Sequence, residues 1–133
     1  MKETENVALI QNVYASFGRG DIQTILQALD ANVKWTTYGP TVIPYAGTKT
    51  GVSEVVTFFE ALGSTQSGQK LTIDEYIAQG DEVVTIGHYK ALVKETGKWV
   101  DSAVAHVFTV RDGKITRFLD FVDTAQAAGA YSR

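Results

Sequence analysis

Cysteine is absent from the chain of 133 residues, and proline occurs only twice. Without cysteine the protein can form neither a disulfide framework nor a thiolate metal site, and the redox compartment stays open. Apolar runs are far shorter than the roughly 20 residues that a membrane-spanning helix requires. Residues 2–11 are polar and helical in pattern, unlike a signal peptide. We therefore predict a cytoplasmic protein with no membrane-bound segment.

A cluster of basic residues is also missing. The net charge is −3, and nucleic-acid binding normally requires a positively charged patch, so we expect no nucleic-acid partner. The two histidines, His88 and His106, do not have the spacing of familiar metal sites, and we expect no metal and no cofactor. An apolar content of 44% and this chain length predict a single globular domain over residues 1–133.

Three segments have the period of amphipathic helices. The first covers about residues 3–17, and the second follows Asp21, a good N-cap, to about residues 30–32. The third covers residues 51–62, and Ser53 is expected as its N-cap. These helices precede most of the predicted strands.

The remaining segments predict a sheet. Residues 33–38 are rich in β-branched and aromatic side chains and predict a strand, whereas residues 63–69 predict a loop. Four further strands are expected at residues 71–78, 82–93, 99–110 and 115–122, with a short helix or tail at 125–130. The connections between these four strands are short and contain glycine, which favours antiparallel neighbours. The predicted class is α+β, in which a strongly curved sheet covered by helices would enclose a cavity.

The last two predicted strands carry the residues that point to chemistry. Side chains alternate between the faces of a strand, so even and odd positions separate. Even positions here are mostly apolar, but they include His106 and Asp120. The dipeptide Asp112-Gly113 between the two strands favours a tight hairpin turn. If the even faces are the buried faces, both side chains share one apolar surface. An unpaired carboxylate is costly there, so Asp120 needs a partner.

Several segments together resemble the NTF2-like superfamily, in particular its SnoaL-like and ketosteroid-isomerase-like group. They are Tyr14-Ala15-Ser16-Phe17, Gly20-Asp21, Ala31-Asn32-Val33-Lys34-Trp35, Pro44-Tyr45-Ala46-Gly47, Ala105-His106-Val107-Phe108, Arg111-Asp112-Gly113-Lys114-Ile115 and Asp120-Phe121-Val122-Asp123-Thr124. The resemblance implies a cone: a curved, mainly antiparallel sheet wrapped around about three helices, with an interior apolar pocket and frequent homodimers. Members of this group include isomerases, cyclases, epoxide hydrolases, dehydratases and non-enzymatic binding modules, so the fold leaves the activity open.

Two of these activities require residues that this sequence does not have at the corresponding positions. The resemblance places Thr37 where steroid isomerases have their base, and a threonine cannot abstract a carbon-bound proton. Their oxyanion-binding aspartate falls on His106 if the Asp112-Gly113 turn is one residue shorter, and on Ala105 if it is not. His106 is preferred, because Phe108 and Val110 then keep the inward apolar face. The arginine and second aspartate of the epoxide hydrolases would come from residues 87–90, which include no acidic residue. SnoaL-type polyketide cyclases use an aspartate on the closing strand, and Asp120 or Asp123 resembles it.

The predicted catalytic residues are His106, as a general acid/base, and Asp120, as its orienter or partner acid. Tyr14 is expected as an auxiliary donor. The alternatives are a histidine satisfied within the core, an ion pair of Asp120 at the sheet margin, and a helix-packing role for Tyr14. Asp123 is expected to cap the terminal segment, and His88 to lie on the outer face, where it could serve a dimer interface.

Aromatic and aliphatic side chains must line a cavity in such a fold. The predicted ligand-binding residues are Tyr14, Trp35, Tyr38, Phe58, Tyr89, Phe108, Phe118 and Val122, with Tyr45 a candidate for the rim. The predicted partner is a small hydrophobic molecule, and a homodimer is expected. We predict a cofactor-free isomerase, cyclase or dehydratase that acts by proton transfer. The alternatives are a non-catalytic binding domain and a dimerising interaction module, the second of which predicts a collapsed pocket.

Overall fold

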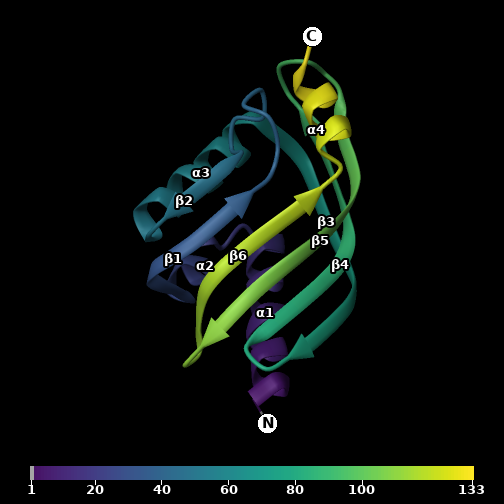
Figure 1. The fold of residues 1–133 in the computed structure, drawn as a ribbon. Coiled ribbons are helices and arrows are strands. Elements are labelled where there is room, and N and C mark those ends of the chain that lie inside the picture. The colour runs from purple at the N-terminus through teal and green to yellow at the C-terminus, as the bar shows by residue number, and fades with distance from the viewer. Residues whose placement is uncertain (1) are drawn as a thin grey trace.

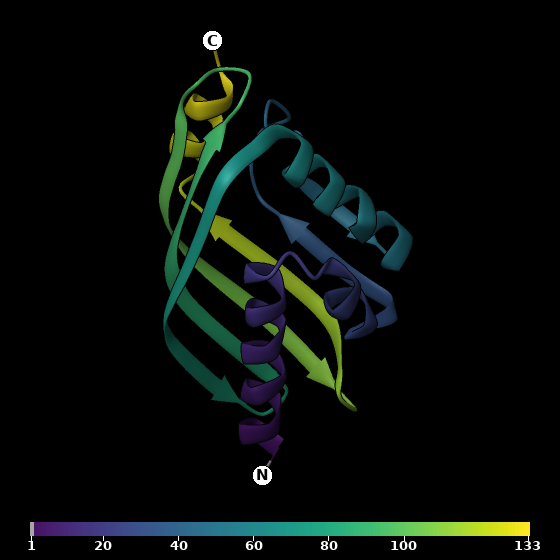
Figure 2. The same cartoon turned by 180° about the vertical axis from the view of Figure 1, so that it is seen from behind.

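A computed structural model of the protein describes residues 2–133. Within this range the elements are α1 (Lys2–Gly18), α2 (Ile22–Gln27), β1 (Leu29–Thr37), β2 (Gly47–Thr50), α3 (Val52–Thr65), β3 (Gln66–Gln79), β4 (Glu82–Val93), β5 (Trp99–Arg111), β6 (Lys114–Val122) and α4 (Thr124–Tyr131). The strands form one sheet in the order β2-β1-β6-β5-β4-β3 (Figure 1). Seen from behind, α1, α2 and α3 lie on one face of this curved sheet (Figure 2). The predicted α+β class is confirmed.

The meander from β3 to β6 follows the turn residues of the sequence. All its neighbouring pairs are antiparallel, and β4 has the predicted bounds. Asp112 and Gly113 both have positive φ, 51° and 74°, as a two-residue hairpin turn requires. Among the described strands, β1 and β6 pair in parallel, which makes the sheet mixed.

Several predicted boundaries are wrong because long-range pairing overrides local pattern. The second helix ends at Gln27, since Leu29 already pairs with Ile115 of β6. Residues 47–50, where no strand was predicted, form edge strand β2. Helix α3 continues to Thr65 through the predicted loop, and its N-cap is Gly51 instead of Ser53. Asp21 does cap α2, accepting a hydrogen bond from the Thr24 backbone amide.

The concave face of the sheet and the helices enclose the core. On β5 the even positions are all buried, which confirms the alternation expected from the sequence; they are Val100, Ser102, Val104, His106, Phe108 and Val110. Opposite them, the helices contribute the buried side chains Ile10, Ile25 and Val55. The polar residues among the even positions of β5 therefore face an apolar interior.

A bulge and a close backbone contact bend the sheet at one place. On β3 the register shifts between Ile73 and Glu75, which pair with consecutive residues Gly87 and Ile86 of β4. The extra residue, Asp74, bends its strand. A Cβ atom on Gly87 would lie 2.0 Å from the backbone oxygen of Thr72. Position 87 therefore has room only for glycine.

We predict that Gly87→Ala lowers the free energy of unfolding by about 2 kcal/mol or more, because the added methyl group must displace a backbone carbonyl. Gly63→Ala is the control, since its Cβ in α3 would meet no atom within 4 Å, and it should be neutral or stabilising by up to about 1 kcal/mol. Urea unfolding followed by circular dichroism measures both. Equal stability of the two variants would contradict the close contact.

Candidate functional site: a polar row beneath an apolar cavity

Four polar side chains stand next to one another across the sheet. His106 of β5 is the direct register partner of Thr85 on β4 and of Asp120 on β6. Asp120 is in turn the partner of Thr37 on β1. These four residues, called the polar row below, come from four strands. Their alignment follows from the pairing register, because side chains opposite one another on neighbouring strands share a face.

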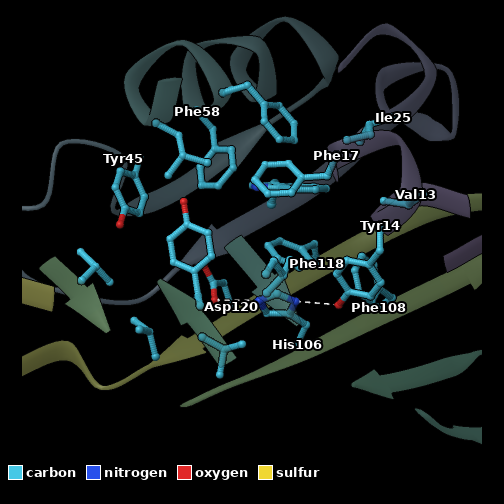
Figure 3. Close-up of a pocket in the computed structure, with 18 residues that line it drawn as sticks. Val13, Tyr14, Phe17, Ile25, Tyr45, Phe58, His106, Phe108, Phe118 and Asp120 are labelled. Atoms are coloured by element: carbon cyan, nitrogen blue, oxygen red, sulfur yellow. Dashed lines mark hydrogen bonds and ion pairs between the residues drawn. The ribbon is translucent and has the colours of Figure 1, made fainter. Parts of the chain in front are cut away.

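The polar row is connected through the helix residue Tyr14. Its hydroxyl lies 2.7 Å from His106 Nδ1 and 2.6 Å from Thr85 Oγ1. His106 Nε2 lies 3.2 Å from Asp120 Oδ1, and Thr37 donates a hydrogen bond of 3.2 Å to Asp120 Oδ2. Figure 3 shows the contacts from Tyr14 through His106 to Asp120. Sequence reasoning predicted Tyr14, His106 and Asp120, but it missed Thr85 and gave Thr37 no role.

The proton positions follow from what each group can donate. An ionised carboxylate only accepts, so the proton of a neutral His106 belongs on Nε2, facing Asp120. Nδ1 then accepts from the Tyr14 hydroxyl, and Tyr14 accepts from Thr85. Both ring nitrogens of His106 are thereby engaged, whereas each Asp120 oxygen keeps a lone pair. Asp120 is also the more exposed side chain, at 16% against 9% for His106.

The polar row borders a largely apolar cavity. Its volume is about 90 Å³. In Figure 3 the helix side chains Val13, Phe17, Ile25 and Phe58 lie above His106, Asp120 and Phe118 of the sheet. The ring centroids of Trp35 and Phe118 are only 4.0 Å apart.

A second polar group adjoins the cavity around the buried Gln66. Its Nε2 donates to the hydroxyl oxygens of Tyr45 and Tyr131, at 3.1 and 2.9 Å. Tyr89 donates its hydroxyl proton to Gln66 Oε1. Tyr45 and Tyr89 line the cavity. No sequence signal pointed to Gln66, which lies in a predicted loop.

Burial keeps the cavity tyrosines neutral. Removal from water raises the pKa of Tyr14, Tyr45 and Tyr89 well above the usual range of a phenol, and the Asp120 charge adds to this in each case. All three therefore remain protonated near neutral pH. They are hydrogen-bond donors, not bases.

The structure brings together most of the predicted site residues. Those that line the cavity are His106, Asp120, Tyr14, Trp35, Phe58, Tyr89, Phe108, Phe118 and Val122. The prediction for Tyr38 is wrong: it follows the inward Thr37, so alternation turns it outward, where it is 43% exposed and stacks on Phe121. The noted candidate Tyr45 does line the cavity.

Two other acidic residues, Asp123 and Asp101, have structural roles outside the cavity. Asp123 caps α4 by accepting from the Gln126 backbone amide, as predicted. His88 lies half exposed on the outer face, also as predicted, and its Nε2 contacts Asp101. The chain thus carries one His–Asp pair inside and one outside.

Residues 2–133 contain neither a metal-binding cluster nor a membrane-spanning helix. No group of three or more acidic or histidine side chains that could hold a metal ion occurs there. No helix in this range is long and apolar enough to cross a membrane.

Comparison with known proteins agrees with this fold. The geometry defines an NTF2-like protein: a curved sheet, helices on its concave face and a cavity between them. The family model of the SnoaL-like domain matches residues 10–118. The chain therefore belongs to the SnoaL-like domain family, as the sequence resemblance implied.

Individual relatives are similar over nearly the whole chain. An uncharacterised protein of Mycobacterium tuberculosis is 27% identical over 122 residues, which cover 91% of each chain. An NTF2-like protein of unknown function from Burkholderia pseudomallei has a TM-score of 0.90 at 27% identity, covering 97% of this chain and 98% of its own. TerC, co-crystallised with polyporic acid, has a TM-score of 0.86 at 30% identity, covering 96% and 98%.

We predict that Asp120→Asn weakens the hydrogen bond at His106 Nε2, because a neutral amide oxygen accepts less strongly than a carboxylate. The contact of Tyr14 with Nδ1 stays in place in both proteins. The measurement is the NMR chemical shift of the Nε2 proton, which should move upfield in the variant.

The outer His–Asp pair supplies the control. Asp101→Asn should leave the Nε2 proton signal of His106 unchanged, because the two pairs lie on opposite faces of the sheet. An unchanged His106 signal in Asp120→Asn would show that the inner pair is not coupled.

Proposed function

We propose that the cavity binds a small, largely apolar aromatic molecule and that Asp120 transfers a proton on it without a cofactor. The observation that carries this proposal is the Asp120 carboxylate: it borders an apolar cavity, is held at both oxygens, and keeps accepting capacity. A carboxylate in such surroundings is a strong candidate for a general base. The products of this chemistry would be those of an isomerase, cyclase or dehydratase.

In this proposal His106 positions the base and is not the base itself. His106 was the predicted acid/base, but both of its ring nitrogens already have partners: Nδ1 contacts Tyr14, and Nε2 contacts Asp120. Asp120 would take a proton from a carbon beside a carbonyl group, and the electron pair of that C–H bond would move toward the carbonyl oxygen. Asp120 would then return the proton at another position. Its own proton count is unchanged after one cycle.

The comparison with TerC supports an aromatic ligand. TerC is 30% identical to this chain over nearly its whole length, and it was co-crystallised with polyporic acid, a small aromatic molecule. The wall of the present cavity is rich in rings, including Trp35, Phe58, Phe108 and Phe118. Aromatic rings gain from packing against one another beyond the area that they bury.

A non-catalytic binding domain is the second candidate, and one observation favours it. The polar row already satisfies most of its own hydrogen-bonding groups, as a purely structural network would. The interaction-module alternative has less support, because it requires a collapsed pocket and the cavity here is open.

Hydrogen–deuterium exchange at carbon separates the two candidates. We predict that the protein accelerates exchange at the α-carbon of aryl ketones in D2O, with 1-tetralone as the first probe. Asp120→Asn should slow the protein-dependent exchange by about 100-fold or more, the usual size of a general-base contribution. NMR measures the rate directly.

Asp101→Asn is the matched control, because it neutralises an aspartate of the outer pair and should exchange at the wild-type rate. If wild type binds aryl ketones yet gives no exchange above the protein-free rate, the protein is a binding domain. If Asp120→Asn exchanges as fast as wild type, another group is the base.

We also propose that the outer face of the sheet pairs two copies of the chain. Phe121, Ala105 and Ile86 are register partners on this face, and Tyr38 stacks on Phe121. Phe121, Ile86 and Tyr38 are each more than one-third exposed. Such a contiguous apolar surface is typical of an interface.

For this surface we predict that Phe121→Arg converts a dimer into a monomer, because an arginine would be buried without a partner there. Light scattering after size-exclusion chromatography measures the mass. Trp99→Arg is the control, since Trp99 is equally exposed but lies at the far end of β5. A monomeric wild type would refute the proposed pairing.

A further inference from the structure

The hydroxyl proton of Tyr45 has no acceptor within the described structure. Gln66 Nε2 has two hydrogens, and both are used: one donates to Tyr45 and one to Tyr131. Gln66 Oε1 accepts from Tyr89. Tyr131 can donate to Thr65 Oγ1, 2.8 Å away, because the Thr65 hydroxyl donates its own proton to the Ala61 carbonyl. Within residues 2–133, the Tyr45 hydroxyl thus accepts a hydrogen bond while its own proton has no acceptor.

Tyr45 is fixed in place although it lies in the connection between β1 and β2. The preceding residues make two turns, with backbone bonds from Ile43 to Pro40 and from Ala46 to Ile43. Ile43 is almost fully buried, and the Tyr45 ring packs edge-on against Phe58 at 5.7 Å. A donor held this firmly does not need to be ordered when a ligand binds.

A second buried donor in the same wall is also unpaired. The indole nitrogen of Trp35, Nε1, has no hydrogen-bond partner within residues 2–133, although Trp35 is only 4% exposed. Trp35 lines the cavity together with Tyr45. Buried polar groups are normally paired, so unpaired ones beside a cavity point to a ligand that completes them.

We propose that the Tyr45 hydroxyl donates a hydrogen bond to a carbonyl oxygen of the bound molecule, so that the cavity selects aromatic ketones or quinones over hydrocarbons of the same shape. Gln66 is the positioning residue, because its amide fixes the Tyr45 oxygen and leaves the proton free. The proposal rests on the proposed function, since it names the substrate class of the same cavity.

The Tyr45 donor and the Asp120 base would act on two neighbouring atoms of the bound molecule. Burial and the Asp120 charge both raise the pKa of Tyr45, so its hydroxyl stays a donor at neutral pH. When Asp120 removes a proton from carbon, negative charge develops on the neighbouring carbonyl oxygen. A preorganised donor at that oxygen stabilises the charge as it forms. The Trp35 indole is a second unpaired donor in the same cavity wall.

The experiment compares two ligands that differ at one group. Benzophenone and diphenylmethane carry the same two rings, joined by a carbonyl in the first and by a methylene in the second. We predict that wild type binds benzophenone about tenfold more tightly, the effect of one hydrogen bond. Tyr45→Phe should abolish this preference. The infrared C=O stretch of bound benzophenone should lie at lower wavenumber in wild type than in Tyr45→Phe.

Tyr131→Phe is the matched control. It also deprives Gln66 Nε2 of an acceptor, but Tyr131 is not among the residues that line the cavity. It should keep both the preference and the infrared shift. Affinity for diphenylmethane shows in each variant that the cavity is intact, so a loss of stability cannot be mistaken for a loss of the donor.

Three other results would each contradict the proposed role of Tyr45. If both ligands bind wild type equally, the donor role of Tyr45 is refuted while the aromatic cavity stands. If the preference persists in Tyr45→Phe but is lost in Trp35→Phe, the indole is the donor and the assignment to Tyr45 is wrong. If neither ligand binds, the proposed aromatic function fails together with this inference.

Discussion

The pairing register of β5 with its two neighbours is the constraint on which the site depends. It places His106 directly between Thr85 and Asp120, and the parallel pairing of β1 with β6 adds Thr37 to the same line. A shift of one residue in any of these pairings would turn one member of the row to the outer face. The tight turn at Asp112 and Gly113 starts the central hairpin. A register shift between Thr109 and Val110 then brings His106 opposite Asp120. The turn and this irregularity together determine the position of groups that lie some distance along the strands.

An acidic side chain in an apolar wall is tolerated because its neighbours satisfy it. An isolated buried carboxylate would be very costly, but Asp120 has Thr37 on one oxygen and His106 on the other. In the same way, the Tyr14 hydroxyl pairs with His106 and with Thr85, so these polar groups are also satisfied. The network leaves accepting capacity on the cavity side, where water or a ligand can use it. This distribution distinguishes the inner His–Asp pair from the solvent-exposed pair of His88 and Asp101.

Sequence reasoning recovered the fold class and the inner pair because both depend on short-range regularities. Alternation along each strand indicated that His106 and Asp120 are both inward, but the turn dipeptide alone would have paired His106 with Leu119. The register shift between Thr109 and Val110, which the sequence did not reveal, makes the two residues partners. The rule of alternation, applied to the end of β1, should have turned Tyr38 outward, but the aromatic character of the residue was given more weight. The roles of Thr85 and Thr37 could not be predicted, because the local sequence around a β-branched residue in a strand does not reveal its partners across the sheet. Gln66 was missed for a related reason: the polar residues around it suggested a loop, while packing against Tyr45, Tyr89 and Tyr131 extended the strand and buried it.

The position of Tyr45 has a consequence for how members of this family can diverge. Asp120 belongs to the interior of the sheet, where a change of register or length would disturb four strands at once. Tyr45 belongs to a connection of nine residues between β1 and β2, from 38 to 46, outside the regular pairing. Insertions and substitutions are tolerated far better in such connections than in paired strands. Reactivity and ligand preference are therefore encoded in separable parts of the chain, so that one can vary over evolution, or in the laboratory, while the other is retained.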